Sequence, residues 1–283
     1  MAFFDILKLL MMTVIASVGE WLPVSNTGHL AVFGHYLGFS DWNASAAVRE
    51  SFAGAAVFGT VLASCALFLP NNGAFTKTQD NRRAVARDRI RFYVAILLAW
   101  IPALAVQLMF GRKLNEFLMA TDSLQNLKLV MVLMIAGGAV VWLSEIRNKN
   151  VQVRYELPED IPVSMILLFG LIPLLSFLPG TCRFGLTILA AVSLGVSRRT
   201  ALTLAVFFNM PAAIVFGAVP VIRRLSSVGG IAVSELLTAS VLSFLISFFV
   251  LKAVLTLLGR NRMSRFGQYR VGFGILLYLF SIL

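Results

Sequence analysis

Ten residues near the start of the chain, at positions 20–29 (EWLPVSNTGH), carry the side chains best suited to chemistry. They combine the carboxylate of Glu20 and the imidazole of His29 with small polar side chains, and apolar runs lie on both sides. Ionisable groups at membrane depth are costly and mark functional sites, where a partner or a wet cavity holds them. An imidazole can serve as general acid, general base or nucleophile, and a carboxylate can orient it or bind a divalent cation. Glu20 and His29 are therefore the candidate catalytic residues, and Glu20 is the candidate metal ligand.

A second polar stretch interrupts the apolar second half of the chain, at positions 178–185 (LPGTCRFG). Its Arg183 offers a planar fork of N–H donors that suits phosphate oxygens. Both stretches contain Leu-Pro, and each is followed by a Leu-Gly-x-Ser sequence, LGFS or LGVS. Half-helices that start after Pro23 and Pro179 would add backbone N–H groups for the same anion. We therefore expect both stretches to line one phosphate pocket. Its candidate binding residues are Ser25, Asn26, Thr27, Thr181, Cys182 and Arg183.

The same residue types also have structural explanations. Glu20 could hydrogen-bond to a neighbouring helix, His29 could be a neutral core residue, and Arg183 could simply pair with Glu20. Asn209, two residues before Pro211, is interpreted as part of a helix kink. The occurrence of Glu, His and Arg at two related interruptions favours the functional interpretation.

Composition identifies the class of protein. The 283 residues are 59% hydrophobic and 13% charged, which is far more apolar than a water-soluble domain requires. The net charge of +11 does not indicate nucleic-acid binding, because most Lys and Arg residues stand between apolar runs, where they determine membrane topology. Two cysteines do not suggest a disulfide framework. The predicted fold class is an all-α polytopic membrane protein.

Two pairs of apolar pieces are each shorter than the ~20 residues of a straight span. They flank the polar stretches, and we expect them to form broken re-entrant helix pairs at residues 3–39 and 161–196. Recurrence of this arrangement predicts an inverted repeat whose broken helices meet near the bilayer midplane. The other expected spans lie near residues 52–69, 93–110, 127–143, 200–222, 231–258 and 271–283.

The chain divides into a first repeat at residues 1–146, a polar linker at 147–160 and a second repeat at 161–283. Counting Lys and Arg gives 15 on one side of the expected membrane and 5 on the other. The positive-inside rule makes the first side cytoplasmic and places both termini outside. That side consists of the loops at residues 77–91, 147–154, 198–199 and 260–270.

These motifs carry a family resemblance. EWLPVSNTGH with GHYLGF, and PGTCRFGLT with LGVSRR, resemble the two signature regions of the bacterial undecaprenyl-diphosphate phosphatase family, the bacitracin-resistance type, over essentially the whole chain. The resemblance implies an inverted repeat in the bacterial inner membrane. It also implies hydrolysis, dependent on Mg²⁺ or Ca²⁺, of undecaprenyl diphosphate to recycle the lipid carrier of peptidoglycan synthesis. The family has been considered as a lipid flippase too. Motif residues retained here are Glu20, Ser25, Thr27, His29 and Arg183.

The chain also departs from the family pattern. Alanine stands where the first glutamate of a pair is expected, an amide replaces a serine, and further polar residues are missing. Loss of carboxylates weakens binding of Mg²⁺ or Ca²⁺, which prefer oxygen ligands. An amide side chain hydrogen-bonds but is not a nucleophile. The departures are Ala16, Asn26, Ala53, Val57, Cys182 and Phe184.

The sequence therefore predicts a divergent family member that binds polyprenyl (undecaprenyl) phosphate or diphosphate, with translocation as a further role and with hydrolysis reduced or absent. The alternative is an active undecaprenyl-diphosphate phosphatase in which Glu20 and His29 suffice. A more remote alternative is a transporter of a small anion. The expected partners are the lipid and the membrane, without nucleic acid, and a homodimer is a candidate assembly.

Overall fold

The computed structural model describes residues 3–36, 46–68, 82–118, 124–175, 177–178, 180–212, 215, 233–260 and 263–282. These residues form helices and connections but no β-strand, as the sequence predicts. The helices are α1 (Phe3–Trp21), α2 (Asn26–Tyr36), α3 (Ala46–Phe68), α4 (Arg82–Ala99), α5 (Ile101–Leu118), α6 (Leu124–Arg147), α7 (Val163–Phe169), α8 (Ile172–Leu175), α9 (Arg183–Ser193), α10 (Arg198–Asn209), α12 (Val233–Arg260) and α13 (Ser264–Phe280), with short 3₁₀ turns η2 (Asn148–Asn150) and η3 (Pro158–Asp160).

Three helical stretches among the described residues are long and apolar enough to cross a membrane, namely Arg87–Phe110, Leu127–Asn150 and Leu236–Leu258. They expose large apolar side chains such as Met109 and Phe249. Extended apolar surface of this kind is compatible with a lipid environment and not with water. The prediction of an all-α membrane protein is therefore confirmed.

The predicted span near residues 93–110 consists of two helices that meet at Trp100. The indole Nε1 of Trp100 donates to the carbonyl oxygen of Phe208 at 2.9 Å, which ties this junction to α10. Helix α4 begins at Arg82, inside the basic loop expected at residues 77–91. The basic residues that suggested a loop therefore extend the helix beyond its apolar part.

Helices α3 and α12 pack closely through small and hydroxyl side chains. Ser240 Oγ donates to the carbonyl oxygen of Ala55 at 3.0 Å, and Ser243 Oγ donates to that of Ala56 at 2.7 Å. Gly59 faces the same contact, where an added Cβ would collide with the carbonyl oxygen of Ser240. Small residues allow helix backbones to approach closely within a membrane.

Gly59→Ala is expected to lower the free energy of unfolding by about 1–3 kcal/mol, because the clash is with backbone that cannot rotate away. Gly272→Ala is the matched control, since a Cβ there meets nothing within 4 Å. The control should gain up to about 1 kcal/mol from helix propensity. Both values can be measured by unfolding the detergent-solubilised protein. Equal stability of the two variants would contradict the packing argument.

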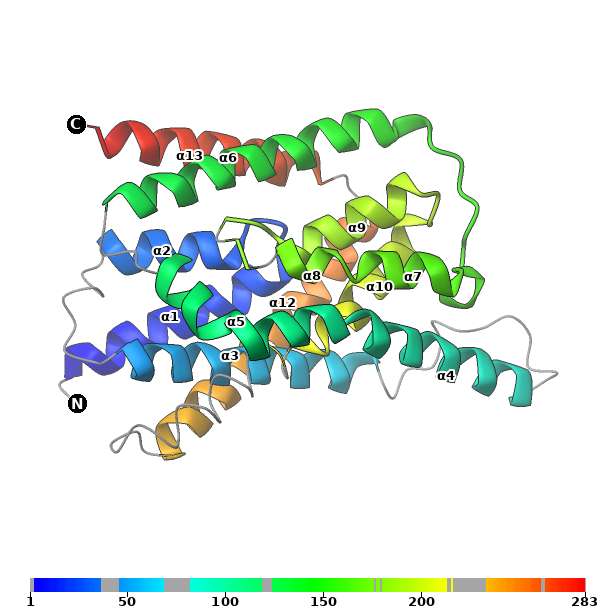
Figure 1. Cartoon of the computed structure of the whole chain (residues 1–283), viewed down its shortest axis with the longest axis horizontal. Coiled ribbons are helices and arrows are strands. Elements are labelled where there is room, and N and C mark those ends of the chain that lie inside the picture. The colour runs from blue at the N-terminus through cyan, green and yellow to red at the C-terminus, as the bar shows by residue number, and fades with distance from the viewer. Residues whose placement is uncertain are drawn as a thin grey trace.

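Helices α6 and α13 lie side by side along one face of the molecule (Figure 1). Gly138 of α6 faces Gly267 of α13, where an added Cβ would lie 2.9 Å from the carbonyl oxygen of Gly267.

Helix α13 begins at Ser264, earlier than the span expected at 271–283. Arg270, counted from the sequence as a basic loop residue, is consequently inside this helix and fully buried.

Both chain termini lie at one end of the helical bundle, and the polar linker after α6 lies at the other (Figure 1). The linker is held to the end of α9 by a bridge between Tyr155 and Val196. Arg154 N–H donates to the carbonyl oxygen of Gly195 at 2.7 Å, and Gly195 adopts a φ of 86° that favours glycine. Two of the loops counted as basic therefore lie together, and their cytoplasmic orientation stays a prediction.

Candidate functional site

The first polar stretch separates α1 from α2, and the chain reverses direction there (Figure 1). Ser25, the residue before α2, has a φ of 72° although it is not glycine. A conformation of this kind costs about 1–3 kcal/mol and persists only where the surroundings enforce it. The Oγ atom of Ser25 accepts from the N–H of Gly28 at 3.2 Å and so caps the start of α2.

The second polar stretch has the same construction. Gly180 has a φ of 94°, and α9 begins at Arg183. Cys182 occupies the N-cap, where its Sγ atom accepts from the N–H of Gly185 at 3.4 Å. Each interruption therefore starts a short helix that is capped by one of the predicted site residues.

The two stretches meet each other. Gly180 N–H donates to Thr27 Oγ1 at 3.4 Å, and Cys182 Sγ lies 3.5 Å from the carbonyl oxygen of Leu22. The rings of Trp21 and Phe184 pack edge to face with centroids 5.8 Å apart. Side chains from both halves of the chain consequently form one site.

Glu20 and Arg183 form an ion pair at the centre of this site, and both side chains are largely buried. Asn209 Nδ2 donates to Glu20 Oε1 at 3.1 Å, and its Oδ1 accepts from Arg183 Nε at 2.6 Å. Asn26 Nδ2 donates to Glu20 Oε2 at 3.1 Å. Both oxygens of the carboxylate therefore accept hydrogen bonds from protein nitrogen atoms.

Asn209 is a site residue that sequence reasoning assigned to a helix kink. It is the last residue of α10 and is buried, with 1% of its surface exposed. Its amide bridges Glu20 and Arg183, so it orients the ion pair. Trp100 also reaches the site, with the guanidinium of Arg183 5.6 Å from the centroid of its ring. The signal that could have identified Asn209 is an amide directly after the apolar run at residues 204–208, because a buried amide needs hydrogen-bond partners.

The sequence predicts that Glu20 orients His29, but in the structure other residues hold the imidazole. Its Nδ1 lies 2.8 Å from the carbonyl oxygen of Ser25, and its Nε2 lies 2.9 Å from the hydroxyl of Tyr269. In the neutral ring Nδ1 donates to the carbonyl, so Nε2 accepts from the tyrosine hydroxyl. The ring also stacks on Phe273 at 5.2 Å. Tyr269, which the sequence did not suggest, thus positions the imidazole from α13.

The side chain of Thr181 hydrogen-bonds to the backbone that precedes it. Its hydroxyl donates to the carbonyl oxygens of Leu175 at 2.7 Å and Leu178 at 2.9 Å. Of the predicted phosphate-binding residues, Arg183 and Asn26 therefore contact the central carboxylate, whereas Thr181 has a turn-forming role.

Of the positions that depart from the family pattern, Asn26, Cys182 and Phe184 belong to the two polar stretches that form this site. Ala16 is buried one turn before Glu20, on the same face of α1. Phe184 is buried against Trp21, and Val57 is partly buried in α3. The side chain of Ala53 lies outside the described residues.

A divalent cation would need several oxygen ligands, including carboxylates. Among the residues that the structure describes, no three His, Cys, Asp or Glu side chains gather closely enough to hold a metal ion. Glu20 already accepts hydrogen bonds on both oxygens, and one donor is the cationic Arg183. As a set of metal ligands, these side chains do not fit a Mg²⁺ or Ca²⁺ site.

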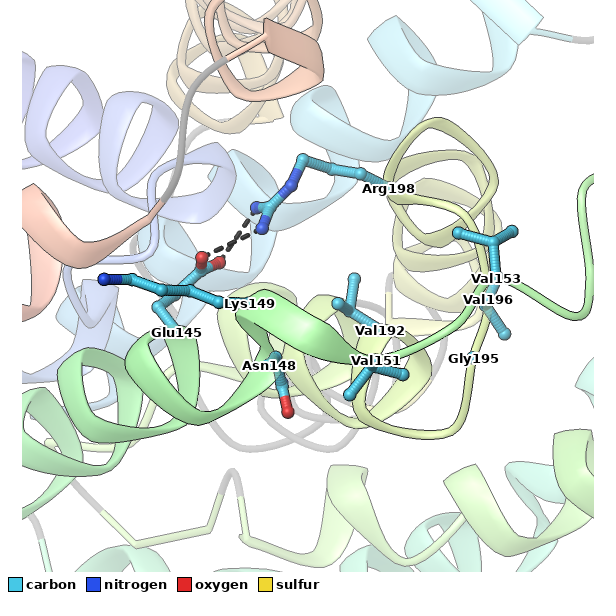
Figure 2. Close-up of a pocket in the computed structure, with 9 residues that line it drawn as sticks. All are labelled: Glu145, Asn148, Lys149, Val151, Val153, Val192, Gly195, Val196 and Arg198. Carbon is cyan, nitrogen blue, oxygen red and sulfur yellow. Dashed lines mark hydrogen bonds and ion pairs between the residues drawn. The ribbon is translucent and has the colours of Figure 1, made fainter.

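A cavity of about 220 Å³ lies elsewhere, between the end of α6 and the end of α9 (Figure 2). Glu145, buried at 2% exposure, accepts two hydrogen bonds from Arg198 at 2.8 and 2.9 Å. This bidentate pair fixes the start of α10 against α6. No residue of either polar stretch lines this cavity. It is lined by Glu145, Asn148, Lys149, Val151, Val153, Val192, Gly195, Val196 and Arg198.

Comparison with known proteins gives matches along the whole chain. The family described as "Bacitracin resistance protein BacA" matches residues 9–276. An undecaprenyl-diphosphatase of Streptococcus mutans is 28% identical over 288 residues, which cover 100% of this chain and 98% of that protein. Undecaprenyl-diphosphatases of Acetivibrio thermocellus and Enterococcus faecalis are 26% and 28% identical and cover 98% and 99% of this chain, with 98% and 100% of their own lengths aligned.

Proposed function

We propose a function from the finding that the chain belongs to the bacitracin resistance protein BacA family. The protein binds a polyprenyl phosphate or diphosphate at the junction of its two polar stretches, residues 20–29 and 178–185. Relatives that match its full length are undecaprenyl-diphosphatases, which makes undecaprenyl phosphate and diphosphate the ligands to test first. The chain also has helices long and apolar enough to cross a membrane, which is the environment that an isoprenoid tail requires.

The observation that carries the proposal is the placement of Arg183 where the two capped helix starts meet. Its guanidinium is held by Glu20 and Asn209, so its direction is fixed before any ligand arrives. The first turns of α2 and α9 bring backbone N–H groups to the same junction. Helix N-termini and arginine are both favourable for phosphate oxygens.

The second part of the proposal is that hydrolysis is reduced or absent. Asn26 stands where a hydroxyl nucleophile is expected from the family resemblance, and its amide is used to hold Glu20. With Ala16 in place of a second carboxylate, Glu20 is the one carboxylate expected from the motif, and no group of three His, Cys, Asp or Glu side chains among the described residues supports a divalent cation. Binding requires neither feature, whereas metal-assisted hydrolysis requires both.

Translocation of the lipid is a further element of this proposal. Broken helices from two halves of a chain that meet in one site are typical of secondary transporters. Here the junction joins residues 22 and 182, from opposite halves of the sequence. A site of this kind can be opened to either side in turn, which would move the bound headgroup across the membrane.

The alternative function is an active undecaprenyl-diphosphate phosphatase. One observation favours it: Tyr269 and Ser25 hold His29 in a fixed orientation, and a general acid or base must be positioned in this way. The relatives' own description as undecaprenyl-diphosphatases also supports this activity.

The deciding experiment measures phosphate release from undecaprenyl diphosphate by the purified protein with Mg²⁺ or Ca²⁺. The wild type is compared with Glu20→Ala and His29→Ala, and the Streptococcus mutans relative is assayed in parallel as the active reference. We expect background release by the wild type together with measurable binding of undecaprenyl phosphate. Robust turnover that is lost in both variants would replace the proposal with the alternative.

A further inference from the structure

Arg270 is a fully buried cation in α13, at 0% exposure. Two glycines of α6 make room for it. An added Cβ at Gly137 would collide with its Nη2 atom, and one at Gly138 would lie 2.7 Å from its Cβ. The guanidinium therefore occupies a space that the neighbouring helix leaves for it.

Most of the donors on this guanidinium are unused. Nη2 donates to the carbonyl oxygen of Gly180 at 2.5 Å, but Nε and Nη1 have no hydrogen-bond partner among the residues that the structure describes. The ion pairs found among the described residues involve other arginines, so Arg270 has no counter-ion there. A buried charge without a partner is strongly unfavourable. The unused donors thus point to an anion that the site binds.

Arg270 lies beside the junction of the two broken stretches. Its partner Gly180 belongs to the second stretch and also donates to Thr27 of the first. The adjacent residue, Tyr269, contacts His29. An anion at the junction would therefore lie near this charge.

The charges at the junction do not balance. Glu20 neutralises Arg183, which leaves the positive charge of Arg270 uncompensated among the described residues. A phosphate group supplies both the missing charge and several acceptors for a planar fork of donors. A diphosphate can reach two cations at once, whereas a single phosphate group has fewer oxygens to share.

We propose that Arg270 is a second phosphate-binding cation. Because Arg183 is already paired with Glu20, Arg270 neutralises the negative charge of the phosphate that Arg183 does not. This inference rests on the proposed function and adds a specificity: Arg270 favours the diphosphate over the monophosphate and over the uncharged polyprenol. The Gly180 contact keeps the guanidinium beside the second polar stretch.

The test compares binding of undecaprenyl diphosphate, undecaprenyl phosphate and undecaprenol to purified protein in nanodiscs by native mass spectrometry. Arg270→Gln should weaken diphosphate binding at least about tenfold and leave undecaprenol unchanged, as expected for the loss of charged hydrogen bonds. Arg270→Lys, which keeps the charge, should recover part of the preference. Arg265→Gln is the matched control, because Arg265 is exposed on the same helix.

The ratio of the affinity for undecaprenyl diphosphate to that for undecaprenol distinguishes a ligand-binding role of Arg270 from a structural one. A merely structural Arg270 would reduce both affinities together and leave that ratio unchanged, which would overturn the inference. If Arg270→Gln does not fold, Arg270→Met fills the space without a charge and is judged by the same ratio. Failure of the wild type to bind any polyprenyl phosphate would instead refute the proposed function. Binding that depends on Arg183 but not on Arg270 would refute this inference alone.

Discussion

Arg183→Gln is expected to abolish binding of undecaprenyl phosphate and to lower the free energy of unfolding by about 3–5 kcal/mol. The substitution removes the cation that faces the ligand and leaves the carboxylate of Glu20 buried without its counter-charge. It also removes the donor to Asn209, so the amide loses its orientation. Binding can be measured by native mass spectrometry, and stability by unfolding in mixed detergent.

A double-mutant cycle separates these two effects. Glu20→Gln combined with Arg183→Gln should be less destabilised than the sum of the single variants, because no unpaired charge remains. Ligand binding should stay absent, since the phosphate-binding cation is gone in both. Arg199→Gln is the control, because Arg199 is exposed at the start of α10. Retention of wild-type affinity by Arg183→Gln would contradict the proposed role of this arginine.

The position of the two interruptions could be predicted from the sequence because each is visible locally. Pro, Gly and polar residues stop an apolar run that is too short to span a membrane, and the same pattern occurs twice. The pairing of Glu20 with Arg183 was one of two interpretations, and the structure shows it. Local composition thus identified the residues at the junction, although not the direction in which each side chain points.

The partners that position these residues could not be predicted in the same way. The apolar pattern around Trp100 and Tyr269 gives no reason to single them out, and Asn209 was interpreted only as part of a helix kink. His29 and Tyr269 are separated by 240 positions, so only the packing of α13 beside α2 brings them together. Arg270 was assigned to a loop because a charge at the edge of an apolar run usually lies in water.

The largest gain in activity is expected from restoring two of the missing family residues, in the double variant Ala16→Glu with Asn26→Ser. Ala16 lies one turn before Glu20 on the same face of α1, so its replacement places two carboxylates side by side. Asn26→Ser removes the amide that occupies Glu20 Oε2 and returns a hydroxyl to the start of α2. We expect phosphate release from undecaprenyl diphosphate to rise by about 10²-fold or more.

Dependence on a divalent cation distinguishes restored chemistry from a change in binding. Release by the double variant should disappear with a chelator and return with Mg²⁺ or Ca²⁺, and each single variant should give much less. Ala16 is buried, so the new carboxylate will cost stability, and rates must be expressed per folded molecule. A double variant that binds the diphosphate as tightly as the wild type and still releases no phosphate would show that these two positions do not control hydrolysis. The barrier would then lie in the ion pair itself, where Arg183 holds the carboxylate that a cation would have to bind.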